Sequence, residues 1–246
     1  MTLNNFLHEL HQRPSHPLVF NPWRDHDPLN DASSEAPAQR RSHLSRYLEE
    51  RLHRARWLLI AEAPGYQGAK FSGCAMTSER RLLETVDSTL PLANPNRGSR
   101  TEYTASNPYF SGAKYRTSKT QLSSGKNNPL GSLEPTATMV WNALLNHCHS
   151  HDFVLWNAHA WHPHHPQLPL TNRTPTETEL ELGKSTLQSL IALFPDSRII
   201  AIGRKSQETL ASLNISAYPV RHPANGGGGL FRRQIETLIS TEPASA

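Results

Sequence analysis

The chain has 246 residues, of which 36% are apolar, and it carries a formal net charge of +4. This length suits one domain with a single core, and the 19 prolines indicate long irregular connections. The two cysteines, Cys74 and Cys148, exclude a disulfide framework and a four-cysteine zinc or iron–sulfur site. No apolar run is long enough to cross a membrane and no signal peptide is indicated, so we expect a cytoplasmic protein. The slight basic excess favours a polyanionic partner.

Hydrophobic periodicity predicts helices and strands that alternate along the chain. In chain order they are helix 4–13, helix 36–54, strand 57–61, helix 77–89, helix 134–148, strand 152–158, helix 177–194, strand 198–203, helix 205–213, strand 217–220 and helix 228–240. This alternation predicts an α/β protein with a mostly parallel sheet that is covered on both faces. In helix 77–89 we expect Ser78 as a possible cap, with Glu79, Arg80, Arg81 and Glu84 in solvent.

Residues 90–133 form the least regular segment, and a connection of this length is usually either functional or disordered. Its aromatic and basic residues suit contact with nucleic acid, and they equally suit a plain surface loop. They are Tyr103, Tyr109, Phe110, Lys114, Tyr115, Arg116 and Lys119.

Glu62 directly follows a short apolar run and precedes a loop that contains proline and two glycines. A carboxylate next to a buried strand is costly unless it is paired or used in chemistry. Gly65 and Gly68 would allow the backbone of this loop to approach a ligand closely. The alternative is an acid that only stabilises the loop or caps a helix.

Asn157 ends the second predicted strand, and its amide offers both a donor and an acceptor, as needed to read the edge of a pyrimidine. The alternative is that it caps a loop. His159, His162, His164 and His165 follow, and they raise the possibility of a metal site. No neighbouring carboxylate or cysteine completes a ligand pattern, so we expect these histidines to face solvent or phosphate.

His222 ends the last predicted strand and precedes a run of four glycines, Gly226 to Gly229. An imidazole in this position can stabilise a developing anion by hydrogen bonding. The glycines would let the backbone lie against phosphates, and Arg221, Arg232 and Arg233 flank the run. The alternative is a flexible surface loop with an incidental histidine.

In this order and context, the three segments resemble the motifs of the uracil-DNA glycosylase superfamily. The likeness is to bacterial members with a GEAPG-like first motif, matched by residues 61–65 (AEAPG). It extends to Asn157-Ala158, to the later His-Pro-His, to residues 221–227 (RHPANGG) and to residues 21–23 (NPW). The resemblance implies a three-layer α/β/α sandwich with a central, mostly parallel four-stranded sheet. Residues 1–246 would form one such domain, with an irregular insertion at about 90–133.

The resemblance also implies roles for individual residues. Glu62 would activate the water that attacks the sugar carbon, and His222 would stabilise the negative charge on the departing base. The base would be bound by Ala63, Pro64, Gly65, Gly68, Met76 and Asn157. DNA would be contacted by Arg221, Asn225, Gly226, Gly227 and Arg232.

The sequence departs from the family pattern in three places, of which the irregular insertion at 90–133 is one. Ala75-Met76 stands where similar proteins usually have Pro-Phe, and the usual Phe stacks on the extruded base. A methionine supplies a thinner and more flexible contact. The cluster cysteines of the iron–sulfur branch are missing, so no cluster is expected.

The sequence therefore predicts a monofunctional DNA glycosylase that hydrolyses the N-glycosidic bond of uracil or a related deaminated base. We expect a monomer that acts on DNA without a metal or an organic cofactor and without a membrane. Two alternatives stay open: a catalytically inactive nucleic-acid-binding relative, which Met76 favours, and a histidine-rich metal hydrolase. The base that is removed and the preferred DNA strandedness are left open.

Overall fold

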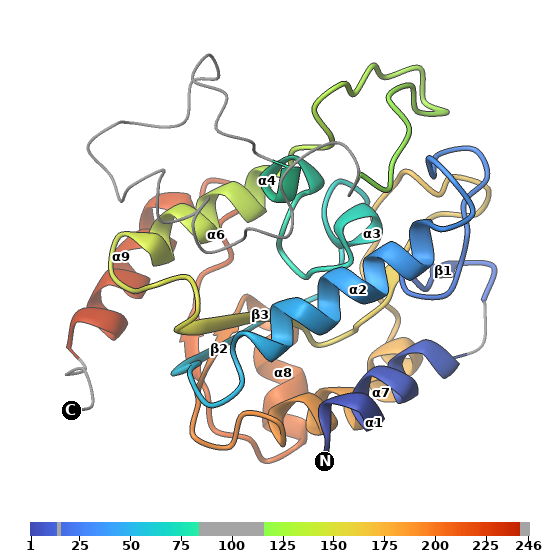
Figure 1. The fold of residues 1–246 in the computed structure, drawn as a ribbon. Coiled ribbons are helices and arrows are strands. Elements are labelled where there is room, and N and C mark those ends of the chain that lie inside the picture. Colours follow the sequence, from blue (N-terminus) through green and yellow to red (C-terminus); the bar gives the residue numbers. More distant parts are fainter. Residues whose placement is uncertain (14–15, 84–115, 242–246) are drawn as a thin grey trace.

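The fold is built on one sheet of four parallel strands, seen in a computed structural model that describes residues 1–13, 16–83 and 116–241 (Figure 1). The strands are β2 (Trp57–Ala61), β3 (Phe153–Asn157), β5 (Arg198–Ile202) and β6 (Tyr218–Val220). Their spatial order is β3-β2-β5-β6, and all three pairings are parallel. The α/β prediction with a four-stranded sheet is confirmed. The sheet is wholly parallel.

Helices cover both faces of this sheet. The helices are α1 (Leu3–Gln12), α2 (Ala36–Glu49), α3 (Ala69–Ser72), α4 (Glu79–Leu83), α6 (Pro135–Leu145), α7 (Glu177–Ile191), α8 (Arg204–Ser212) and α9 (Gly228–Ser240). Helices α6 and α9 pack together on one face, while α7 and α8 lie on the other (Figure 1). A short antiparallel pair, β1 (Val19–Phe20) with β4 (His162–Pro163), stands apart from the main sheet. Within the described residues, no helix is long and apolar enough to span a membrane.

The central strands are buried along their whole length, as continuous apolar runs in parallel sheets require. Every residue of β2 and β3 is buried. Helix α7 begins where Thr176 and Glu179 form a reciprocal capping box. Helix α2 ends earlier than predicted because Arg51 turns inward to donate to the backbone carbonyls of Phe153 and Ser150. His53, with a φ of 62°, lies in the same turn.

The expectation that Glu79 and Arg81 face solvent is wrong. Glu79 is 1% exposed, and its carboxylate accepts hydrogen bonds from the backbone N–H groups of Thr117 (2.7 Å) and Ser118 (2.9 Å). Arg81 is buried and donates to Asn142 Oδ1 at 3.0 Å. The cause is tertiary: residues from 116 onward fold back over α4 and cover it.

The other residues expected in helix 77–89 are Arg80, Ser78 and Glu84. Arg80 is half-buried and donates to the carbonyl of Gly131. The Ser78 hydroxyl is buried and finds no hydrogen-bond partner in the part of the chain that the structure describes, so it does not cap α4. Glu84 and the rest of helix 77–89 lie outside the described residues.

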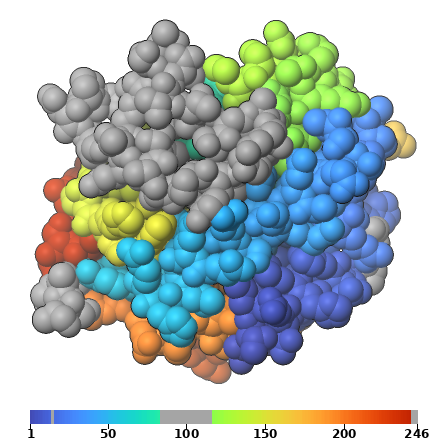
Figure 2. All heavy atoms as spheres, in the orientation of Figure 1, coloured from blue at the N-terminus to red at the C-terminus, as the bar shows by residue number. Residues whose placement is uncertain are grey.

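Residues 116–133, the described end of the irregular segment, pack against the N-terminal loops. The backbone N–H of Lys119 donates to Asn30 O at 2.7 Å, and that of Ala32 donates to Thr117 O at 2.8 Å. Figure 2 shows the two segments side by side, in light green and blue. The side chains of Arg116 and Lys119 donate hydrogen bonds to backbone carbonyls. Both cations therefore help to hold this segment in place. The remaining aromatic and basic residues of the segment lie outside the described residues.

Two buried ion pairs fasten the N-terminal loop to the helices beneath it. Arg40 of α2 binds Asp31 with two hydrogen bonds, of 2.7 and 3.0 Å, and both side chains are wholly buried. Lys70 of α3 binds Asp27 at 2.7 Å. Buried charges are tolerated only when they are paired in this way. The pairs therefore fix the position of the loop that carries Trp23.

Replacing Asp31 with Ala should lower the free energy of unfolding by about 3–5 kcal/mol, because it leaves the Arg40 guanidinium buried and uncompensated. Denaturant unfolding measures this loss. The matched control is Asp196→Ala at an exposed acid, which should stay within about 0.5 kcal/mol of the wild type. Equal losses in the two variants would contradict a special contribution from the ion pair.

Candidate active site

Parallel pairing brings the chemical groups predicted from the sequence to one edge of the sheet. Asn157 ends β3, and Glu62 follows β2. The neighbouring backbone N–H of His159 donates to Glu62 O at 3.0 Å, which extends the ladder between the two strands by one step. Gly203 follows β5, and a Cβ built on it would lie 3.2 Å from the Cβ of His222. Glu62 and His222 therefore lie two strand spacings apart, roughly 10 Å between backbones.

The Glu62 side chain is half-buried and is left without a polar partner by the part of the chain that the structure describes. It makes no hydrogen bond and no ion pair with any of the residues 1–13, 16–83 and 116–241. A loop-stabilising acid would accept hydrogen bonds from nearby backbone N–H groups. The free carboxylate is thus available to a water molecule or a ligand.

The loop from Ala63 to Gly68 is held in place by two residues that lie far along the chain, His162 and Asn172. The His162 ring donates from Nδ1 to Pro64 O at 2.8 Å. Burial lowers the pKa of His162 to about 3, so the ring is neutral in this contact. Asn172 accepts a hydrogen bond from the backbone N–H of Tyr66 at 2.8 Å. These contacts make the loop a fixed wall beside Glu62.

Asn157 is 2% exposed, and its Oδ1 has no hydrogen-bond partner among the described residues. An unpaired buried acceptor costs about 1–3 kcal/mol, a cost that a ligand carrying a donor would remove. Beside the amide is a void too narrow for a water molecule, lined by Trp23, Ala69, Ala75, Trp156, Asn157 and Ala160. Trp23 and Trp156 are stacked there, with centroids 6.0 Å apart. The amide is therefore backed by rigid apolar packing.

Met76, the residue that replaces the usual Phe, is buried and has a φ of 46°. Left-handed backbone is uncommon for residues other than glycine, and it persists only where the surroundings enforce it. Trp141 supplies one restraint, because its indole N–H donates to Met76 O at 3.1 Å. The departure from the family pattern thus lies at a firmly held position.

His222 is half-buried and is poised as a neutral hydrogen-bond donor. Its Nδ1 accepts from the backbone N–H of Ala224 at 3.1 Å, which leaves the ring proton on Nε2. Burial first, and the charge of Arg221 second, lower the pKa of His222. Its Nε2 has no hydrogen bond within the described part of the chain. An N–H donor of this kind stabilises negative charge that develops nearby.

The loop after His222 is a tight turn that leads into α9. Asn225 and Gly226 have φ values of 51° and 76°, and Gly227 N donates to Ala224 O at 3.0 Å. Arg221, Asn225, Gly226 and Arg232 are exposed. Gly227 is buried, and a Cβ on it would overlap the carbonyl oxygen of His222. Gly227 thus allows a close approach that helps to set the position of His222.

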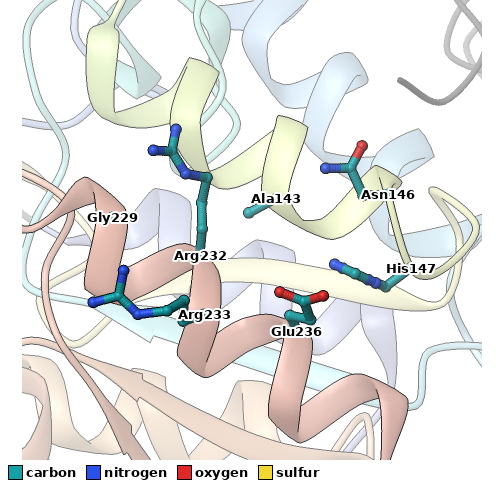
Figure 3. A pocket seen from close by; sticks show the side chains of 7 residues that line it. All are labelled: Ala143, Asn146, His147, Gly229, Arg232, Arg233 and Glu236. Carbon is teal, nitrogen blue, oxygen red and sulfur yellow. The ribbon is translucent and has the colours of Figure 1, made fainter. Parts of the chain in front are cut away.

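A groove of about 320 Å³ runs between α6 and α9, next to this turn (Figure 3). Arg232 and Arg233 project from α9 on one side, and Glu236 points toward His147, which lies just beyond the end of α6. The residues that line the groove are Ala143, Asn146, His147, Gly229, Arg232, Arg233 and Glu236. The groove extends the basic surface beside the glycine turn.

The expectation of solvated histidines is wrong for three of the four. His159 and His162 are wholly buried, and His164 is 8% exposed, because this segment packs inward beside β1 and α7. Only His165 is exposed. Among the residues that the structure describes, no three His, Cys, Asp or Glu side chains are grouped so as to hold a metal ion.

Sequence reasoning missed Asn172, His162 as a support of the loop, and Glu134. The Glu134 side chain lies against Gly65 and Gly68, although these residues are far apart in the sequence. The one local signal is its place directly before Pro135, a residue typical of a helix start. That signal predicts the helix boundary and says nothing about the loop it contacts.

Two comparisons with known proteins give a result, one for the fold and one for the family. No curated protein matches this chain significantly. The crystal structure of wild-type SMUG2 from Pedobacter heparinus has a similar fold, with a TM-score of 0.57 and 11% identity over 98% of this chain and 97% of that one. The profile of the uracil DNA glycosylase superfamily matches residues 49–245, which is most of the chain. The protein therefore belongs to the uracil DNA glycosylase superfamily.

Proposed function

We propose that this protein is a monofunctional DNA glycosylase that hydrolyses the N-glycosidic bond of uracil or a related deaminated base. One observation carries the proposal. A carboxylate, an amide oxygen and an imidazole N–H, from Glu62, Asn157 and His222, share one sheet edge and are all left unused by the described residues. Groups prepared in this way are typical of a ligand site rather than of a structural network.

In the proposed reaction the bond between C1′ and the base nitrogen breaks, and its electron pair leaves with the base. Positive charge develops on the sugar and negative charge on the base. The Glu62 carboxylate stabilises the sugar cation and takes a proton from the water that attacks C1′. The His222 Nε2–H donates to a carbonyl oxygen of the departing base. Asn157 holds the edge of the base, and the loop from Ala63 to Gly68 with Met76 encloses it.

The target nucleotide must leave the DNA stack to reach this edge of the sheet. Arg221 and Arg232 are exposed beside the glycine turn, where they can bind phosphates. Asn225 and Gly226 form the tip of that turn, and Leu230 is an exposed apolar side chain next to it, at 44% exposure. Exposed apolar residues of this kind are used as wedges between base steps. The turn and these side chains would together hold the distorted duplex.

The second candidate is a relative that binds nucleic acid and has lost turnover. The observation that favours it is Met76, buried and held in left-handed backbone where the usual Phe would stack on the base. Binding of uracil-containing or abasic DNA without release of any base across a panel of lesions would select this candidate.

Base release from a uracil-containing oligonucleotide tests the main proposal. Glu62→Gln should slow single-turnover release about 10²–10⁴-fold, because the amide cannot accept a proton from the attacking water. His222→Ala should slow it about 10²–10³-fold, because the departing base loses its donor. Glu49→Gln, at an exposed acid that ends α2, is the matched control and should leave the rate unchanged. Undiminished release in both site variants would rule out this mechanism.

Gly227→Ala should lower the stability by about 1–3 kcal/mol and slow base release, because the new methyl group would push against the His222 carbonyl. Gly229→Ala in the same glycine run is the control. Its methyl group would meet only Arg233 at 3.7 Å, and it should leave stability unchanged or raise it by up to about 1 kcal/mol. Thermal melts and release rates of both variants measure the difference. Equal behaviour would show that Gly227 does not position His222.

Arg221→Ala and Arg232→Ala should each weaken DNA binding and reduce the salt dependence of log Kd by about one unit, if each arginine neutralises one phosphate. Fluorescence anisotropy at several salt concentrations measures the slope. The exposed Arg204 of α8, paired with Glu208, supplies the control variant Arg204→Ala. A slope unchanged in Arg221→Ala and Arg232→Ala would remove these residues from the DNA interface.

A further inference from the structure

Glu134 is a half-buried acid at the start of α6 that performs no capping, although its Oε2 atom is buried. It occupies the N-cap position with extended backbone (φ −99°, ψ 117°), and its side chain makes no cap hydrogen bond. An acidic N-cap residue usually accepts from the backbone N–H groups of the first helical turn. The Glu134 carboxyl instead turns away from its own helix, so its position needs another explanation.

That carboxyl lies against the loop that follows Glu62. A Cβ built on Gly65 would be 3.0 Å from Glu134 Oε1, and one built on Gly68 would overlap Oε2. The amide of Asn172 lies on the same side of Gly65, 3.5 Å from that Cβ position. The absence of side chains at the two glycines is what gives the carboxyl its room. The Glu134 carboxyl therefore lies against the loop that would wall the proposed base site.

Glu134 Oε2 is buried and has no hydrogen-bond partner among residues 1–13, 16–83 and 116–241. Burial alone raises the pKa of Glu134 to about 7. The positive end of the α6 dipole favours the ionised form, but burial prevails. Near neutral pH the group is thus partly protonated, and a protonated carboxyl offers one O–H donor and one acceptor.

Support of the loop does not explain this carboxyl. The loop is already held by His162 at Pro64 and by Asn172 at Tyr66, and Glu134 makes no hydrogen bond to it. Among the described residues no ion pair explains it either, because burial is the one cause of its raised pKa there. An unpaired buried carboxyl costs stability and is typical of a group kept for a ligand.

We propose that Glu134 is a specificity-determining residue, whose carboxyl hydrogen-bonds the extruded base and selects bases with an exocyclic carbonyl over bases with an amino group. The inference rests on the proposed function and deepens it. With its O–H turned to the base, a protonated carboxyl donates to the carbonyl of a deaminated base, whereas the amino group of cytosine would meet that O–H with a donor of its own. Deaminated bases differ from normal ones by this exchange of amino for carbonyl.

The selection should depend on pH, with a sign set by the protonated form. Below a pKa of about 7 the donor is present and the carbonyl base is favoured, and above it the donor is lost and the preference falls. The titratable groups on the neighbouring loop and on α3 are Glu62, Tyr66 and Lys70, of which Lys70 is paired with Asp27. On α9, which packs against α6, they are Arg232, Arg233 and Glu236. Arg173, next to Asn172, is paired with Glu179.

The test is binding of duplexes that carry 2′-fluoro-2′-deoxyuridine or 2′-fluoro-2′-deoxycytidine, nucleotides that resist hydrolysis. Anisotropy titrations across about pH 5.5–8.5 give the ratio of the two Kd values. The wild type should prefer the uridine analogue about 10-fold or more at the acidic end, as one good hydrogen-bond pair allows. The preference should shrink above pH 7. Glu134→Ala should lose it at every pH, and the isosteric Glu134→Gln should keep a preference that no longer changes with pH.

Glu49→Gln is the control and should behave as the wild type, and thermal melts verify that each variant is folded. A preference that survives in Glu134→Ala, or a wild type that binds both analogues equally, would overturn the inference. Base release is measured separately on cleavable DNA. Preference without any release would remove the glycosylase proposal and retain the assignment of Glu134, whereas release without a Glu134-dependent preference would do the reverse.

Discussion

Parallel pairing of β2 with both β3 and β5 is the constraint on which the site depends. In a parallel sheet every strand delivers its carboxyl end to the same edge, and helices must cover both faces. Here the pairing sets Asn157, Glu62 and His222 in order along that edge, although they are far apart in the sequence. Open α/β sheets bind ligands at this edge for the same reason. A shift of β2 relative to β5 would separate the acid from the imidazole.

The supports of the site are rigid, while its reactive groups are left without partners. His162 and Asn172 hold the loop after β2, and Trp141 holds the backbone of Met76. By contrast, Asn157 Oδ1 and Glu134 Oε2 are buried and unpaired within the described part of the chain. Such unpaired groups lower the stability of the fold, so other parts of the structure must compensate. The apolar central strands and the buried pair of Arg40 with Asp31 provide this stability. The arrangement is that of a surface prepared for a polar ligand.

Much of this architecture is predictable from the sequence because it depends on local patterns. The strand at Trp57–Ala61 and the helix at Gly228–Ser240 have the predicted bounds, since continuous apolar runs and glycine punctuation are local signals. The placement of Glu62 and His222 at strand ends follows from those bounds and from the family motifs. Parallel topology then brings the strand ends to one edge.

What the sequence did not predict depends on contacts between distant segments. Glu79 is buried because residues 117 and 118 fold over α4, and nothing in the spacing of the helix indicates that cover. His162 is buried because β4 pairs with β1, more than a hundred residues earlier. Glu134 carries only a helix-start signal, and its approach to Gly68 exists only in three dimensions. Sequence patterns therefore do not predict which polar residues are buried by segments that are distant in the sequence.

The most direct measurement is a crystal structure of the protein bound to a duplex with a single 2′-fluoro-2′-deoxyuridine. The extruded base should lie at the carboxyl edge of the sheet, with its polar edge about 3 Å from the Asn157 amide and a carbonyl oxygen about 3 Å from His222 Nε2. Glu62 should lie next to the C1′ atom, at the sugar end of the glycosidic bond, with His222 at the base end. A nucleotide bound away from this edge, or one with Glu62 and His222 on the same side of that bond, would contradict the proposed charge separation.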